Sequence, residues 1–143
     1  LGYLLQAQGD LAGARPYPER ALAIRERVLG PEHPDTALSL NNLGDLLQAQ
    51  GDLAGARPYT ERALAIRERV LGPEHPNTAQ SLNNLGVLCY YEGDRAAAAG
   101  YIRRALAIWA RVLGPNHPQT AQARADLAFL LSDDEESNTD NTD

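Results

Sequence analysis

The fold is decided by residues 39–79, which read SLNNLGDLLQAQGDLAGARPYTERALAIRERVLGPEHPNTA. The part after Gly51 places apolar residues three or four positions apart, which is the stripe of an amphipathic helix: Leu53, Ala56, Tyr59, Ala63, Ile66 and Val70. Asp52 suits the N-cap of this helix, and Gly51 suits the end of the one before it. The part before Gly51 carries a second apolar stripe, on Leu40, Leu43 and Leu47. The stretch therefore predicts a pair of helices.

This pair recurs along the chain with a period of 42 residues. Leu1–Asn42 and Leu43–Asn84 differ at only four positions, and Leu85–Asp126 keeps 23 of the 42 residues of the second copy. A fourth copy begins at Leu127 and is lost after Leu131. Near-identical tandem copies indicate one small module stacked on itself, each copy covering the apolar face of its neighbour.

The predicted fold is an all-α, right-handed α-solenoid of stacked antiparallel helix pairs. β-branched residues are few and no segment alternates with period two, so strands are not expected. We expect helices at about 1–8, 10–29, 34–50, 52–71, 76–92, 94–113 and 118–131. The solenoid is expected to span 1–131, with repeats at about 1–34 (truncated), 35–76 and 77–118 and a capping helix at 118–131. Residues 132–143 are expected to form an acidic disordered tail.

The charge distribution argues against nucleic acid and anionic membranes as partners. The net charge is -6, but six of the nineteen acidic residues lie in the last twelve positions. The remaining 13 acidic residues balance the 13 basic ones, so the body lacks a basic footprint. No apolar run is long enough to cross a bilayer, and a single cysteine cannot form an internal disulfide. The chain contains no methionine and opens in the middle of a repeat, so we expect a fragment of a larger intracellular, cytoplasmic protein.

The 42-residue module resembles a tetratricopeptide repeat (TPR) of the longer kind found in kinesin light chain. The small residues of that pattern fall at matching places in three copies: Gly44, Gly51, Ala56 and Ala63; Gly86, Gly93, Ala98 and Ala105; and Gly2, Gly9, Ala14 and Ala21. The resemblance implies that the first helix of each pair lines a concave groove and that the second lies outside. It also implies a role in binding a peptide or protein, without catalysis.

The residues that could carry chemistry have structural explanations. His33, His75 and His117 each occupy a Gly-Pro-x-His-Pro turn, and equivalent positions of stacked repeats stand about 8–10 Å apart, too far to share one zinc ion. We interpret them as turn or cap residues. Cys89 takes the place of Leu5 and Leu47 on an apolar stripe, which favours a buried thiol. We expect no catalytic residue, no metal and no cofactor.

The candidate binding residues lie on the exposed stripe of the first helices. The predicted groove consists of Tyr3, Gln6, Asn41, Asn42, Asp45, Gln48, Gln80, Asn83, Asn84, Val87, Tyr90 and Tyr91, with Gln122 and Asp126 offered by the last helix. Asparagine and glutamine can both donate to and accept from a peptide backbone, and tyrosine supplies contact area. A merely solvated face would carry similar residues. Trp109 replaces Arg25 and Arg67, and it is either packed beneath the last helix or exposed as a contact residue.

Some tetratricopeptide domains clamp the C-terminal carboxylate of chaperones with basic residues beside an asparagine. Asn42 and Asn84 match that asparagine, but the positions of the cations hold Leu38, Gln80, Gln122, Asn41, Asn83 and Asp126. Weak or absent binding of acidic C-terminal peptides is therefore expected. The predicted function is a protein- or peptide-binding scaffold. The alternatives are a structural spacer, an array that self-associates through its ends, and the sensor arm of a multi-domain nucleotide-dependent signalling protein.

Overall fold

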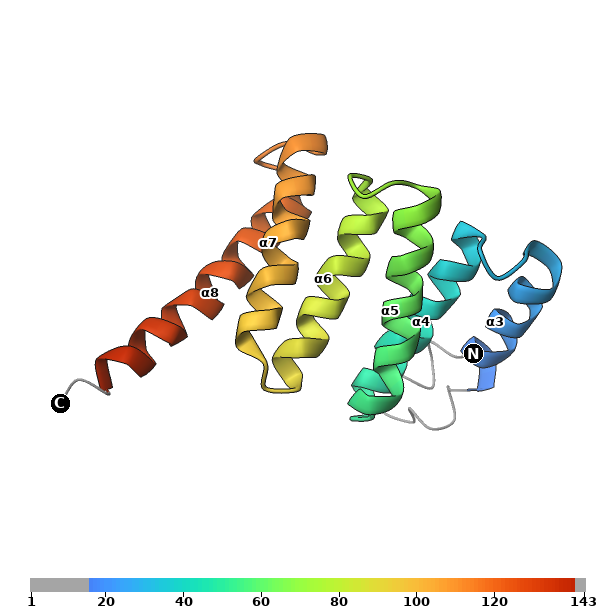
Figure 1. Ribbon diagram of the computed structural model, residues 1–143, viewed down its shortest axis with the longest axis horizontal. Helices are drawn as coiled ribbons and strands as arrows, with labels where there is room; N and C mark the ends of the chain where they lie inside the picture. Colours follow the sequence, from blue (N-terminus) through green and yellow to red (C-terminus); the bar gives the residue numbers. More distant parts are fainter. Residues whose placement is uncertain (1–15, 141–143) are drawn as a thin grey trace. The chain divides into compact units, whose positions relative to one another are not determined.

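The computed structural model describes residues 16–140, with side chains placed for residues 19–132. Every regular element in these residues is an α-helix: α3 (Pro16–Leu29), α4 (Pro34–Ala49), α5 (Leu53–Val70), α6 (Pro76–Tyr91), α7 (Arg95–Val112) and α8 (Pro118–Asp140) (Figure 1). The chain divides into two compact units, Leu1–Pro73 and Glu74–Asp143. The expected helix at 1–8 and the beginning of the one at 10–29 lie outside the described residues.

In the first unit, α4 and α5 form an antiparallel pair, and α3 packs against α4. The pair is held by the apolar stripes that the period predicts, with Leu40, Leu43 and Leu47 of α4 buried together with Ala56 and Ala63 of α5. Polar contacts tie α3 to its neighbours. The Arg25 guanidinium on α3 donates to the Asp35 carbonyl at 3.1 Å and to Ser39 Oγ at 2.8 Å.

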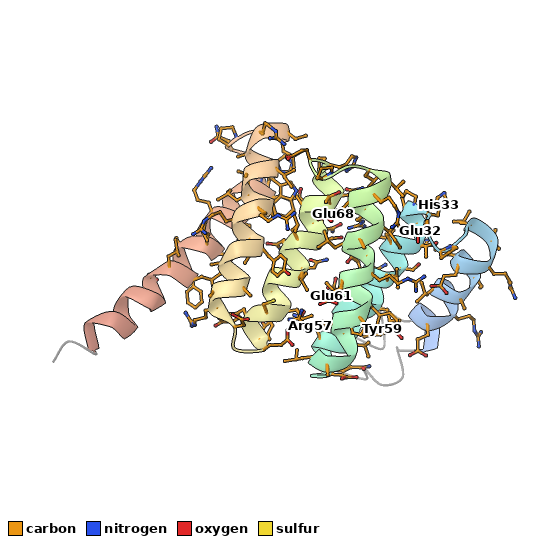
Figure 2. The ribbon with its side chains drawn as sticks, in the orientation of Figure 1. Glu32, His33, Arg57, Tyr59, Glu61 and Glu68 are labelled. Atoms are coloured by element: carbon orange, nitrogen blue, oxygen red, sulfur yellow. The ribbon has the colours of Figure 1, made fainter. Side chains whose placement is uncertain are left out.

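Several ion pairs lie on the surface of the first unit. Arg57 and Glu61, one turn apart on α5, pair at 2.8 Å (Figure 2). Glu32, in the turn before α4, pairs with Arg69 at the end of α5. Exposed pairs of this kind contribute about 0–1 kcal/mol each, so apolar packing dominates stability.

The second unit repeats the pair and adds one helix. α6 and α7 run antiparallel, and α8 packs against α7 (Figure 1). Leu82, Leu85 and Cys89 of α6 are buried, as are Ile102 and Trp109 of α7. The opposite stripe of α6 carries the residues that the sequence placed in the groove.

Two glycines allow the helices of each pair to approach closely. A Cβ on Gly44 would lie 2.6 Å from Thr60 Oγ1, and a Cβ on Gly86 would lie 2.8 Å from Ile102 Cγ1 and 3.2 Å from the Ala98 carbonyl oxygen. In both cases the shortest distance is closer than a real Cβ contact. The small residues of the repeat are therefore a steric requirement of the helix–helix interface.

The histidines act as helix caps, as the sequence predicted. His33 Nδ1 accepts from the Asp35 N–H at 3.0 Å, His75 Nδ1 from the Asn77 N–H at 3.0 Å, and His117 Nδ1 from the Gln119 N–H at 3.2 Å. Each bond satisfies a backbone donor that the first helical turn leaves without a partner. The proline after each histidine occupies the first turn, where its missing N–H costs nothing.

The expected end of the last helix is wrong. α8 continues past residue 131 to Asp140, through part of the segment that we expected to be a disordered tail. The physical reason is in the sequence, because residues 132–140 contain neither glycine nor proline and so lack a residue that would stop a helix. Residues 141–143 lie outside the described part, and the division into repeats and cap stays a prediction.

Candidate functional site

The second unit contains an apolar cleft of about 210 Å³ between the C-terminal half of α6 and α8, with α7 as its floor. Its lining is almost entirely hydrophobic and aromatic: Val87, Tyr90, Tyr91, Ile102, Asp126, Phe129 and Leu130. Tyr91 and Phe129 are among the most exposed large apolar side chains of the described residues, at 59% and 50%. An open apolar surface of this kind is typical of a binding site.

The aromatic wall of this cleft has a defined geometry. The ring centroids of Tyr90 and Phe129 lie 6.0 Å apart with the planes at 70°, and those of Tyr90 and Tyr91 lie 5.5 Å apart at 66°. The Arg95 guanidinium stands 5.5 Å from the Tyr90 centroid and 5.7 Å from that of Phe129. Edge-to-face rings with a cation over them form a preferred arrangement, which holds the rings in place before any ligand arrives.

A second cleft, of about 190 Å³, lies between the N-terminal halves of the same two helices. Its lining is dominated by amide side chains: Gln80, Asn83, Asn84, Trp109, Gln119, Gln122 and Ala123. Trp109 is 4% exposed, and its Nε1 donates to the Pro76 carbonyl oxygen at 3.1 Å. The indole ring is therefore a fixed floor beneath a ring of neutral donors and acceptors.

One side-chain oxygen of this amide cleft lacks a hydrogen bond within the described residues. Asn83 Oδ1 is buried and has no hydrogen-bond partner among the residues that the structure describes. A buried acceptor without a partner costs about 1–3 kcal/mol.

The two clefts follow one another along α6 and α8 and are joined by a hydrogen bond. Gln122 Nε2, in the lining of the amide cleft, donates to Asp126 Oδ1, in the lining of the apolar cleft, at 2.9 Å. We refer to the two clefts together as the trough. It changes along its length from neutral polar to aromatic, and Asp126 stands at the junction.

The trough gathers half of the residues that the sequence predicted for the groove. Gln80, Asn83, Asn84, Val87, Tyr90 and Tyr91 all line it, because they repeat every three or four residues along one face of α6. Gln122 and Asp126 meet them from α8. That these residues bind a ligand stays a prediction.

Sequence reasoning missed part of this lining: Ile102, Gln119, Ala123, Phe129 and Leu130. The signal for Phe129 was present, since it stands one period after Val87 and two after Asp45. Trp109 belongs to the floor of the amide cleft and is buried. Of the two interpretations left open by the sequence, packing beneath the last helix is therefore right and an exposed contact residue is not. Cys89 is buried, as predicted.

The predicted groove residues of the first unit have a different character. Asn41 is 3% exposed, Asn42 and Asp45 are exposed, and Gln48 is half-buried. Tyr3 and Gln6 lie outside the described residues. Asp45 keeps an exposed side, but the protein atoms around its carboxyl desolvate it and raise its pKa from 3.8 to about 6. The positive charge of Arg67 on α5 offsets part of that rise.

A metal cluster and a membrane-spanning helix are both absent from the described part of the chain. Histidine, cysteine and carboxylate side chains do not gather there in a group of three that could hold a metal ion. Of the helices placed between residues 16 and 140, none combines the length and the apolar character needed to cross a membrane.

Known proteins with similar sequences and structures share this architecture. A family model described as Tetratricopeptide repeat matches residues 1–68 and 39–108. A search of curated proteins found no match. Among solved structures, the crystal structure of BtubC (BKLC) from P. vanneervenii is 26% identical with a TM-score of 0.80, over 92% of this chain and 52% of that one.

Two further crystal structures come from a Podosopora anserina protein assigned as a kinesin light chain, with nearly identical TPR-like repeats. One is 27% identical and the other, a variant with a single substitution, is 26% identical; both have a TM-score of 0.83 and cover 90% of this chain and 61% of that one. The chain thus matches about half to three fifths of the length of these proteins. The likeness confirms the predicted fold class, all-α and of the TPR-like solenoid type.

Proposed function

Because the chain belongs to the tetratricopeptide repeat family, we propose that it is an interaction scaffold that binds an extended peptide segment in the trough of its second unit. The repeats of this family are generally non-catalytic protein-interaction scaffolds. The proposal narrows the groove expected from the sequence to the face that α6 and α8 share. The observation that carries it is the pairing of an aromatic cleft with an amide cleft along that face.

The two clefts suit the two needs of peptide recognition. The amide side chains can both donate to and accept from a peptide backbone, which presents an N–H and a C=O at almost every residue. The aromatic cleft can bury one side chain, and such anchors usually supply most of the binding energy. The repeats themselves provide an internal comparison, since α4 carries Asp45, Gln48 and Ala49 where α6 carries Val87, Tyr90 and Tyr91.

That comparison supplies the variant for the test. Val87→Asp, Tyr90→Gln and Tyr91→Ala together give α6 the residues that α4 already carries at the same places, so the helix should still form. A random peptide library displayed on phage is selected against the full chain, and enriched peptides are titrated against the triple variant. Arg103→Gln, an exposed change on α7, is the matched control.

We expect enriched peptides to bind the wild type and the control alike and to lose at least about tenfold in affinity to the triple variant. Circular dichroism of the triple variant verifies that it is helical. Selection without any enriched peptide, or peptides that bind the triple variant as well as the wild type, would contradict the proposal and favour the spacer.

Self-association through the ends of the solenoid, the exclusion of nucleic acid, and a cytoplasmic location stay predictions. Light scattering over a range of concentrations tests the first, because a monomer of constant mass excludes it. In a sensor arm of a signalling protein the same trough would be the receptor surface, so that alternative is compatible with the proposal.

A further inference from the structure

The trough is almost free of formal charge, and the exception is negative. Among the residues that line its two clefts, Asp126 alone carries a formal charge. The two preceding copies have Asn42 and Asn84 at this place in the period, so the carboxylate is specific to the last one. Its position at the junction of the amide and aromatic clefts puts it beside any side chain that enters the aromatic cleft.

We infer that the trough selects an extended peptide with a bulky apolar anchor, aromatic or branched aliphatic, and a lysine or arginine two residues from that anchor. This inference rests on the proposed function and names the class of ligand. The anchor enters the aromatic cleft, and the cation pairs with Asp126.

The volume and walls of the aromatic cleft define the anchor. At about 210 Å³ the cleft exceeds the cavity of roughly 150 Å³ that holds a benzene molecule in an apolar protein core. One aromatic ring or branched aliphatic side chain therefore fits, and a methyl group leaves most of the space unfilled. The rings of Tyr90 and Phe129 stand at 70° to each other, which offers both a face and an edge to an entering ring.

The spacing along α8 defines the position of the cation. Asp126 precedes Leu130 of the aromatic cleft by four residues, about 6 Å along the helix axis. In an extended peptide, side chains on the same face recur every second residue, about 6.6 Å apart. A basic residue two positions from the anchor therefore lies over Asp126, whereas the intervening side chain points away from the trough.

Asp126 is held in position to accept this cation. Gln122 donates to Oδ1, and a carboxylate has enough lone pairs to accept a further charged donor. Basic groups nearby are directed elsewhere, since Arg95 lies over the rings of Tyr90 and Phe129 and the Arg124 guanidinium donates to the Pro115 carbonyl.

The amide cleft contributes affinity without selecting for charge. From Gln80 to Tyr91 the trough follows α6 for about 16 Å, the length of about five extended peptide residues. The neutral amides can bind any backbone, so selectivity resides in the anchor and in Asp126.

The test uses defined peptides titrated against the full chain. Each is seven residues long, acetylated and amidated to remove terminal charges, with phenylalanine at the centre of a serine and alanine background. Lysine, glutamine or glutamate is placed two positions before the phenylalanine in one series and two positions after it in another. A further peptide in each series replaces the phenylalanine of the lysine peptide by alanine.

In the series whose direction matches the bound chain, we expect lysine to bind more tightly than glutamine, and glutamine more tightly than glutamate, by about three- to tenfold in total at low salt. Alanine in place of phenylalanine should weaken binding by about 10- to 100-fold.

Asp126→Asn, which restores the amide of the earlier copies, should remove the preference for lysine and keep the preference for phenylalanine. Glu61→Gln removes the same charge from α5 and should leave both preferences intact.

The outcomes separate this inference from the proposed function. Equal or tighter binding of the glutamate peptides, or a lysine preference that persists in Asp126→Asn, overturns the inference. Peptides from the random library that depend on Val87, Tyr90 and Tyr91 but lack a basic residue also overturn it, while the proposed function stands. If neither the library nor the defined peptides contain a binder, both fail.

Discussion

The indole Nε1 of Trp109 on α7 donates a hydrogen bond to the carbonyl oxygen of Pro76, at 3.1 Å, and so attaches the floor of the trough to the first turn of α6. In the first copy the same place in the period is held by Arg25, whose guanidinium bonds instead to Asp35 and Ser39. One place in the repeat therefore supplies different contacts in the two units.

Trp109→Phe should destabilise the protein by about 1 kcal/mol, because the ring remains and one hydrogen bond is lost. Trp109→Ala should cost about 3–5 kcal/mol, because it also leaves a cavity. Urea unfolding followed by circular dichroism measures both, since Trp109 is the sole tryptophan of the chain and fluorescence would be lost with it. Equal costs for the two variants would show that the ring does not support the trough.

Gly86→Ala should destabilise by about 1–3 kcal/mol, because its Cβ would lie 2.8 Å from Ile102 Cγ1 and 3.2 Å from a backbone oxygen. Gly44→Ala should cost less, because the 2.6 Å contact is with Thr60 Oγ1 and the nearest backbone oxygen is at 3.5 Å. Gly100→Ala on α7 is the control: nothing lies within 4 Å of its Cβ, so higher helix propensity should stabilise by up to about 1 kcal/mol. Thermal or urea unfolding ranks the three variants, and a costly Gly100→Ala would refute the steric explanation.

His75→Ala should destabilise by about 0.5–2 kcal/mol, because α6 loses the acceptor for the Asn77 N–H. His75→Asn keeps a side-chain acceptor at the N-cap and should recover most of that loss. Hydrogen exchange of the first turn of α6 locates the effect. Protection that is unchanged in His75→Ala would indicate that the turn, not the cap, sets the start of the helix.

Asp45 should make stability depend on pH in an unusual direction. Its pKa in the folded protein is about 6, above the ordinary 3.8, so the folded state holds this proton more tightly than the unfolded state. The contribution of Asp45 is therefore complete below about pH 4, declines as the pH rises to about 6, and stays constant above that.

The comparison that isolates Asp45 is the difference in free energy of unfolding between the wild type and Asp45→Asn, measured by urea unfolding from about pH 4 to about pH 7.5. We expect the wild type to lose stability relative to the variant across the interval from about 4 to about 6. If the free energies of unfolding of the wild type and of Asp45→Asn change in parallel over the whole pH range, the raised pKa of Asp45 is contradicted.

Features of the structure that depend on local sequence could be predicted, and features that depend on contacts between helices could not. The 42-residue period, the glycines that end helices and the prolines that begin them predicted every described helix and its approximate bounds, apart from the end of α8, because these signals are local. The stripe of Gln80 to Tyr91 could be placed on one face of α6 for the same reason. The end of α8 was missed, since residues 132–140 contain no helix stop and composition alone suggested a tail.

The rest of the trough depends on contacts between helices. Phe129 could have been found by following the period, but its 6.0 Å approach to Tyr90 depends on how α8 packs against α7. Trp109 shows the limit of inference from repeats. The period relates Trp109 to Arg25, but the two side chains bond to different helices. The Trp109 indole on α7 bonds to Pro76 on α6, the helix before it, whereas the Arg25 guanidinium on α3 bonds to Asp35 on α4, the helix after it.

The measurement that tests the central claim most directly is a map of backbone and indole NMR shift changes when a peptide selected from the library is added to the isotope-labelled chain. We predict that the changes concentrate on Gln80–Tyr91 of α6, on Gln119–Leu130 of α8 and on the Trp109 indole N–H. Changes confined to other faces, such as the exposed side of α7 around Arg103, would contradict the claim that the trough is the recognition surface.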